Sequence, residues 1–198
     1  FEWRSDDSPF DLHMRGVDAI WDEALAGIEL FYGKAGCSEC HSGAFQTDHG
    51  FHAMGLPQIG PGKAARFGTH ARDVGRMRVT GVEADSYAFR TPSLRNVTET
   101  APYGHTGAYK SLRGFVEAHL APSLTIGNYD RGMAILPELT GASDWRALDD
   151  VGEGAAIALA AKSAPHIELS EAEVDQIMAF LESLKDPVAL SERLGIPS

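Results

Sequence analysis

Cys37, Cys40 and His41 stand close together in the sequence, and these two cysteines are the only ones in a chain of 198 residues. The arrangement Cys-x-x-Cys-His is the attachment signature of a c-type haem. Each thiol can add to one vinyl group of the porphyrin, and the two-residue gap lets one turn of chain reach both vinyls. The adjacent histidine is then carried to the iron, where its imidazole can bind. We therefore predict one covalent haem c, held by Cys37, Cys40 and His41.

Three other uses of this motif compete with haem attachment. A thioredoxin-like dithiol would require a βαβ context, and none is visible around Cys37. A four-cysteine zinc site is impossible with two cysteines. A zinc site that adds His49 and His52 would have unusually tight spacing and no finger pattern around it. An accidental match is the remaining alternative.

The residues alone leave the sixth iron ligand open. Methionine or histidine would give a six-coordinate haem for electron transfer, whereas an open position would favour chemistry at the iron. The candidates are Met54, Met77, Met133, His49, His52, His70, His105 and His119. Their spacing does not choose among them.

The composition is that of a soluble globular protein, with 43% hydrophobic and 23% charged residues. The formal charge of −11 argues against nucleic acid as a partner, because nucleic-acid binders are usually basic. An acidic surface also fits a positively charged partner protein. No run of 18 apolar residues occurs, so we expect no membrane span, and we see no signal peptide.

The periodicity of apolar residues predicts a mostly helical fold with long loops wrapped around the haem. Helices are expected over 17–32, 111–120, 153–163 and 171–185, with Ser111 as one N-cap and a capping box formed by Ser170 and Glu173. Residues 1–12, 43–92 and 121–150 read as irregular, and no convincing strand pair is visible. Gly27 is either a tolerated weak point of the first helix or the site of a close helix crossing.

Several segments resemble the C-terminal haem domain of the bacterial dihaem cytochrome c peroxidase and MauG family. These segments, in the family's order, are SPFDLHMRG (8–16), GIELFYGKAGCSECHSG (27–43), TDHGFHAMG (47–55), RDVGRMRVTG (72–81), FRTPSLRNVTETAPYGHTGAYKSL (89–112) and LSEAEVDQIMAFLESL (169–184). The TPSLRN and APYGHTG segments are much more specific than the cysteine motif alone. The resemblance implies a class-I cytochrome c-like domain over 17–185, preceded by a linker-like segment at 1–16 and followed by a tail at 186–198. Residues 121–168 exceed the family's segment and are expected to be an insertion.

The resemblance also implies what the chain does. Family members hold two haems, and the amino-terminal haem is usually the one that reacts with peroxide. This chain is then the electron-transfer half of a peroxidase or MauG-type oxidase. Its expected partners are the N-terminal haem domain and an electron-donor protein or protein substrate. The alternative is a stand-alone monohaem electron carrier without catalytic activity, and a third possibility is an open-site haem that reacts with peroxide alone. Because haem c is assembled outside the cytoplasm, we expect a periplasmic or cell-surface location.

The family pattern suggests a sixth ligand. A methionine lies seven residues after the leucine that follows the Y-x-H-x-G segment in the peroxidases, and a tyrosine takes this place in MauG-like members. Counting from Leu112 reaches His119, which departs from both patterns. The resemblance therefore implies iron ligation by His41 and His119, with Met133 or water as the alternative to His119.

Other residues follow from the resemblance as expectations. Arg76 and Arg95 are candidates for haem propionates, with ordinary surface salt bridges as the alternative. The backbone carbonyls of Thr100 and Pro102 are candidates for calcium, which an asparagine from the missing half would complete. His52 and His105 are expected to make hydrogen bonds around the haem rather than bind iron. The three tryptophans, Trp3, Trp21 and Trp145, are either core residues or electron stepping points.

Overall fold

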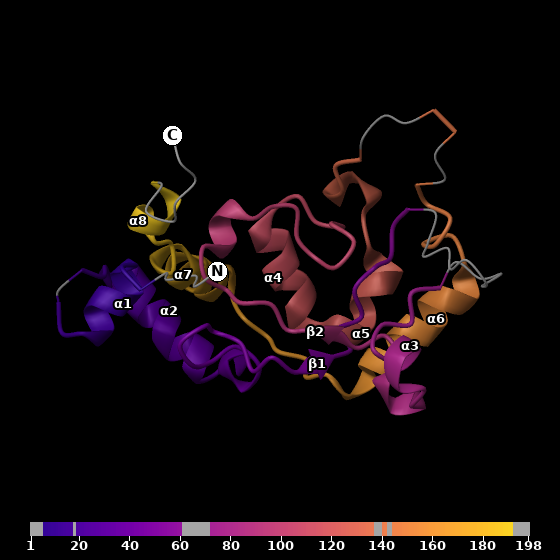
Figure 1. Ribbon diagram of the computed structural model, residues 1–198, viewed down its shortest axis with the longest axis horizontal. Helices are drawn as coiled ribbons and strands as arrows, with labels where there is room; N and C mark the ends of the chain where they lie inside the picture. Colours follow the sequence, from indigo (N-terminus) through magenta and orange to yellow (C-terminus); the bar gives the residue numbers. More distant parts are fainter. Residues whose placement is uncertain (1–5, 18, 61–71, 137–139, 142–143, 192–198) are drawn as a thin grey trace. The chain divides into compact units, whose positions relative to one another are not determined.

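The computed structural model describes residues 6–17, 19–60, 72–136, 140–141 and 144–191 (Figure 1). The chain forms two compact units. Unit 1 comprises Phe1–His49, Thr91–Thr100 and Leu169–Ser198, and unit 2 comprises Gly50–Arg90 and Ala101–Glu168. Each unit is assembled from separated stretches of chain, and the expected segments 1–16, 17–185, 121–168 and 186–198 stay predictions.

Unit 1 is built on two helices that lie side by side, α2 (Asp22–Tyr32) and α7 (Glu171–Ser183), as Figure 1 shows. Phe180 of α7 is fully buried and meets Phe31 of α2 edge to face, with their ring centroids 4.7 Å apart. Buried aromatic pairs of this geometry add stability beyond the area they bury. The helix pair is therefore the centre of the core of unit 1.

Gly27 lies where α2 approaches α7. A methyl group built on Gly27 would overlap the carbonyl oxygen of Gln176 and would lie 2.9 Å from the Cβ of Phe180. The close-crossing interpretation of Gly27 is therefore correct. The glycine is required because two backbones pass with no room for a side chain between them.

The ends of these helices follow local capping rules. The capping box predicted for α7 is present, because the Ser170 hydroxyl accepts from the Glu173 amide and the Glu173 carboxylate accepts from the Ser170 amide. Helix α2 begins at Asp22 rather than near residue 17, and its N-cap Trp21 makes no side-chain capping bond.

The prediction that residues 1–12 are irregular is wrong from Pro9 onward, whereas residues 6–8 are irregular as expected. Helix α1 (Pro9–Met14) begins after Ser8, with a capping box formed with Asp11 and a proline in its first turn. Proline is favoured at that position because its missing N–H would have no helical partner there. Unit 1 also holds the short helix α8 (Pro187–Leu190), capped by the Asp186 carboxylate, and a 3-10 turn at Val97–Glu99.

Unit 2 contains α3 (Met77–Thr80), α4 (Leu112–Leu120), α5 (Pro122–Thr125) and α6 (Val151–Ala160). Helices α4 and α6 match two of the expected helices, and the Ser111 hydroxyl caps α4 as predicted. The region 121–150 is less irregular than expected, because α5 is followed by 3-10 turns at Ile126–Asn128 and Arg131–Met133. Further 3-10 turns lie at Glu83–Asp85 and Ala161–Ser163.

One strand pair was not expected from the sequence. β1 (Phe51–His52) and β2 (Phe89–Arg90) pair antiparallel, with Phe51 opposite Arg90 and His52 opposite Phe89. Strands of two residues are too short to show alternation of apolar and polar residues. The fold is nonetheless mostly α, as predicted, and no helix among the described residues is long and apolar enough to cross a membrane.

A buried polar network ties α6 to the chain before β2. The Tyr87 hydroxyl donates to Glu153 Oε2 over 3.0 Å, and Arg72 Nε lies 2.9 Å from the same oxygen. Glu153 is only 1% exposed, so the arginine offsets the cost of burying its charge.

Candidate haem-attachment site

The cysteine motif forms a single tight turn directly after α2. Gly36 adopts a left-handed conformation, and Cys37–Glu39 then form a 3-10 helix. The amides of Cys40 and His41 both donate to the Cys37 carbonyl, at 3.3 and 2.9 Å. One turn of backbone thus carries both thiols and the histidine, as haem attachment requires.

No disulfide joins Cys37 and Cys40, and the surroundings of both sulfurs favour a neutral thiol over a thiolate. Burial raises the pKa of Cys37 to about 11. Burial, followed by the negative charges of Asp48 and Glu39, raises the pKa of Cys40. Catalytic dithiols need a lowered pKa, because the thiolate is the nucleophile. The thiol environment therefore does not support the thioredoxin-like alternative.

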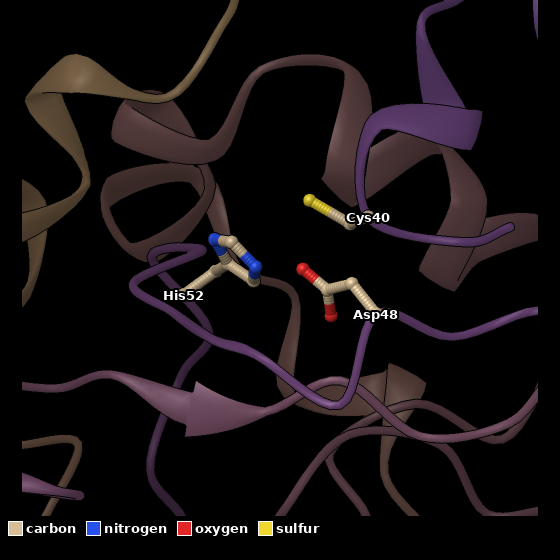
Figure 2. A group of neighbouring side chains, drawn as sticks. All are labelled: Cys40, Asp48 and His52. Atoms are coloured by element: carbon tan, nitrogen blue, oxygen red, sulfur yellow. The ribbon is translucent and has the colours of Figure 1, made fainter.

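Figure 2 shows the Cys40 thiol and the Asp48 carboxylate near each other, with one oxygen within 4.8 Å of the sulfur. Both belong to unit 1, whereas His52, also labelled there, belongs to unit 2. The Asp48 amide donates to the Cys40 carbonyl over 2.7 Å, which holds Asp48 beside the motif.

The imidazole of His41 is oriented by a backbone carbonyl. Its Nδ1 lies 3.1 Å from the carbonyl oxygen of Gln46. A histidine whose Nδ1–H donates to a carbonyl carries its lone pair on Nε2, the nitrogen that then binds a metal. This tautomer fits an axial ligand of a haem iron, and the two thiols on the same turn fit the two vinyl groups.

Gln46 is a site residue that the sequence analysis did not identify. It lies in the short loop after the motif, where its backbone N–H donates to the Gly43 carbonyl over 3.0 Å. Nothing in the sequence indicated this role, because Gln46 lies outside the motif and contacts His41 through its backbone oxygen.

His119, the predicted sixth ligand, lies in unit 2 on the last turn of α4. Its Nδ1 lies 2.8 Å from the Phe115 carbonyl, one helical turn back, and its ring meets the Phe115 ring edge to face at 4.4 Å. The Nδ1–H tautomer is thus favoured at His119 as well, with the lone pair on Nε2.

The other sixth-ligand candidates have varied surroundings. The thioether sulfur of Met77 lies 2.9 Å from the Ser86 hydroxyl, and Met133 lies against Gly114 of α4. The ring of His105 stacks on Phe89 with centroids 3.6 Å apart. His49 has a positive φ of 55° and His52 lies in β1, whereas His70 lies outside the described residues.

The two arginines expected near haem propionates both have carboxylate partners. Arg95 is a half-buried member of unit 1, and its Nη2 lies 2.7 Å from Asp11 Oδ1 and 2.8 Å from the Ala44 carbonyl. Arg76, in unit 2, is 41% exposed and lies 3.3 Å from Asp85 Oδ2 and over the Phe51 ring. These contacts are of the kind expected for ordinary salt bridges, and the propionate role stays a prediction.

The predicted calcium ligands and electron stepping points also remain predictions. Thr100 follows the 3-10 turn of unit 1, and its hydroxyl donates to the Val97 carbonyl, whereas Pro102 belongs to unit 2. Trp21 occupies the N-cap position of α2, and Arg131 lies over the Trp145 ring at 5.0 Å, whereas Trp3 lies outside the described residues.

Comparison with known proteins identifies relatives of this chain. The chain is 33% identical over 191 residues to the methylamine utilization protein MauG of Methylorubrum extorquens, covering 94% of this chain and 42% of that protein. It is 34% identical over 140 residues to the cytochrome c551 peroxidase of Pseudomonas aeruginosa, covering 68% of this chain and 39% of that protein. The chain belongs to the bacterial cytochrome c peroxidase and MauG family. No family model matches it.

Solved structures agree with this peroxidase and MauG membership. A MauG-like protein associated with microbial copper homeostasis aligns with a TM-score of 0.64 and 25% identity, over 95% of this chain and 54% of its own. A variant of the dihaem peroxidase BthA from Burkholderia thailandensis aligns with a TM-score of 0.63, over 93% of this chain and 46% of its own, at 22% identity. The latter supports the fold alone. The chain thus spans about two fifths of the length of the curated relatives cited here.

Proposed function

We propose that this chain is the electron-transfer haem c domain of a dihaem peroxidase or MauG-type oxidase. It would pass electrons or oxidising equivalents to and from a peroxide-reacting haem in an N-terminal half of the same protein. The observation that carries the proposal is the Cys37–His41 turn, with the His41 Nδ1 held by a carbonyl, in a chain of the peroxidase and MauG family. The relatives' greater length supports a second haem domain.

The proposed iron ligands are His41 and His119. Each offers an imidazole whose Nδ1 lies within hydrogen-bonding distance of a backbone carbonyl, so each is suited to bind a metal through Nε2. The bound haem would supply one-electron redox chemistry, and the protein sets its potential through the axial ligands. These two side chains would hold the iron six-coordinate and exclude peroxide from it.

The ligand set bears on the type of enzyme. Methionine ligation raises a haem potential, so an imidazole in its place should lower it. A low-potential haem accepts electrons poorly from a high-potential cytochrome and is better suited to share oxidising equivalents with a second haem. The ligand set therefore favours a MauG-like or specialised oxidase over a peroxide-scavenging enzyme.

The remaining parts of the proposal concern the surroundings of the protein. We place it in the bacterial periplasm or at the cell surface, with an electron-donor protein or a protein substrate as its partner. Calcium bound through the carbonyls of Thr100 and Pro102 would accompany the second domain, because calcium accepts carbonyl oxygens.

Variants of His119 test the ligand assignment. Bis-imidazole ferric iron is low-spin, so the holoprotein should give a low-spin electron paramagnetic resonance signal. His119→Gly should convert it to a high-spin signal, and His119→Met should keep a low-spin iron at a higher potential. His105→Ala is the matched control, and it should leave the signal low-spin. An unaltered low-spin signal and potential in both His119 variants would overturn the assignment.

The single attachment motif supports one alternative, a stand-alone monohaem electron carrier. Counting haems per polypeptide in the protein purified from its native source distinguishes the two. Two haems per chain, with oxidation of the protein by peroxide, support the peroxidase or oxidase. One haem per chain and no reaction with peroxide support the carrier.

A further inference from the structure

Gln46 combines burial with a backbone conformation that its residue type seldom adopts. Gln46 is only 2% exposed, and its φ is +50°. Positive φ is uncommon outside glycine and costs energy unless the surroundings fix it. Something in unit 1 must therefore hold this residue in place.

Hydrogen bonds to both polar atoms of the Gln46 side-chain amide hold this residue in place. The Tyr32 hydroxyl donates to Gln46 Oε1 over 2.9 Å, and Gln46 Nε2 donates to the Gly43 carbonyl over 3.1 Å. Tyr32 is the last residue of α2, and its ring lies 5.4 Å from that of Phe31. The amide is thus tied to the helix on one side and to the haem-attachment loop on the other.

The backbone carbonyl of the same residue faces His41 Nδ1 at 3.1 Å. We propose that Gln46 and Tyr32 are positioning residues, which fix the carbonyl that orients the His41 imidazole and thereby help set the potential of the haem. The inference rests on the proposed function only in requiring that His41 bind the iron. It does not depend on His119 or on a second haem.

The physical reason lies in the outer hydrogen bond of the ligand. A well-aligned Nδ1–H···O=C bond fixes the ring plane and makes the imidazole a stronger donor. A stronger donor stabilises ferric iron and lowers the potential. A Gln46 that can move weakens this bond, so the potential should rise.

Two variants separate this role from simple loop stability. Tyr32→Phe removes one hydroxyl and keeps the ring, whereas Gln46→Met keeps the size of the side chain and removes both amide hydrogen bonds. Tyr32 and Gln46 both line an open cavity of about 540 Å³, so neither change overpacks the core. Tyr129→Phe is the control, because its hydroxyl donates to the Ala108 carbonyl in unit 2.

The experiment is a spectroelectrochemical titration of the holoprotein, with ferric electron paramagnetic resonance as a second readout. Tyr32→Phe should raise the midpoint potential and shift the g values, Gln46→Met should raise the potential at least as far, and Tyr129→Phe should leave both unchanged. Because Tyr32 acts through Gln46, the double variant should match Gln46→Met alone. A structural role alone would lower stability without moving these readouts.

Wild-type potential and g values in Tyr32→Phe would overturn the inference, as would a double variant equal to the sum of the two single shifts. If Gln46→Met does not fold, comparing the midpoint potential and g values of Tyr32→Phe with those of Tyr129→Phe still tests the inference. Failure of the proposed function is distinguishable, because protein without covalent haem would give no haem spectrum to titrate.

Discussion

At His41 and His119 similar local chemistry arises in different backbone contexts. His41 reaches a carbonyl five residues ahead through the turn that Gln46 completes, whereas His119 reaches the carbonyl of Phe115 within its own helix. Both bonds favour a proton on Nδ1. The suitability of each histidine for binding a metal through Nε2 thus depends on the neighbouring backbone as well as on the residue type.

The buried hydroxyl of Tyr87 is a weaker acid than that of an exposed tyrosine. Burial, followed by the Glu153 carboxylate, raises its pKa to about 12 from an ordinary value of 10. The folded state therefore keeps this proton at pH values where the unfolded state loses it. Its contribution to stability is complete below pH 10 and is lost as the pH rises through about 12.

Tyr87→Phe should therefore lose stability less steeply than wild type between pH 10 and 12, in urea unfolding measured across that range. At neutral pH the variant should be less stable by about 1–3 kcal/mol, because Glu153 loses a buried hydrogen bond. Parallel stability curves across this pH range would contradict the assignment.

At the scale of the elements, the α2–α7 crossing depends on the absence of a side chain at Gly27. Gly154, in α6, is a matched glycine within a helix, and a methyl group there would meet only Ile126 at 3.8 Å, an ordinary contact. The two positions share a helical backbone and differ in the space beside them.

We therefore expect opposite effects of the same substitution. Gly27→Ala should destabilise unit 1 by about 1–3 kcal/mol, because it forces the two helices apart. Gly154→Ala should stabilise the protein by about 0.5–1 kcal/mol, because alanine restricts the unfolded chain and favours the helix. Thermal unfolding of the holoprotein measures both, and destabilisation of similar size at both positions would refute the crossing as the cause.

At the scale of the whole molecule, the formal charge of −11 bears on the choice of partner. Such a field attracts positively charged proteins and is screened over about 10 Å at 0.1 M salt. Electron exchange with a small basic cytochrome should slow as ionic strength rises, and exchange with an acidic one should accelerate. Stopped-flow absorbance across a salt series measures both, and rates independent of salt would rule out steering by net charge.

Much of the fold was predictable because its signals are local. The Ser170 capping box, the Ser111 N-cap and the apolar stripe of α7 identify helices from residues a few positions apart. Helix α1 was not predicted, although Ser8, Pro9 and Asp11 form a helix-start signal. Its six residues are too few to show the periodicity of apolar residues that identifies a helix. The β1–β2 pair was missed because two-residue strands depend on contacts between distant segments.

The sequence by itself determined which residues are available to attach a haem, because Cys37, Cys40 and His41 lie on one turn of chain whatever the rest of the fold does. The tertiary structure decided which neighbours these residues meet. Gln46 orients His41 through a backbone oxygen, which every residue possesses, so no side-chain pattern could reveal it. Likewise, a lone glycine in a helix looks the same whether it is tolerated or required, and only the passage of Gln176 beside Gly27 shows that it is required.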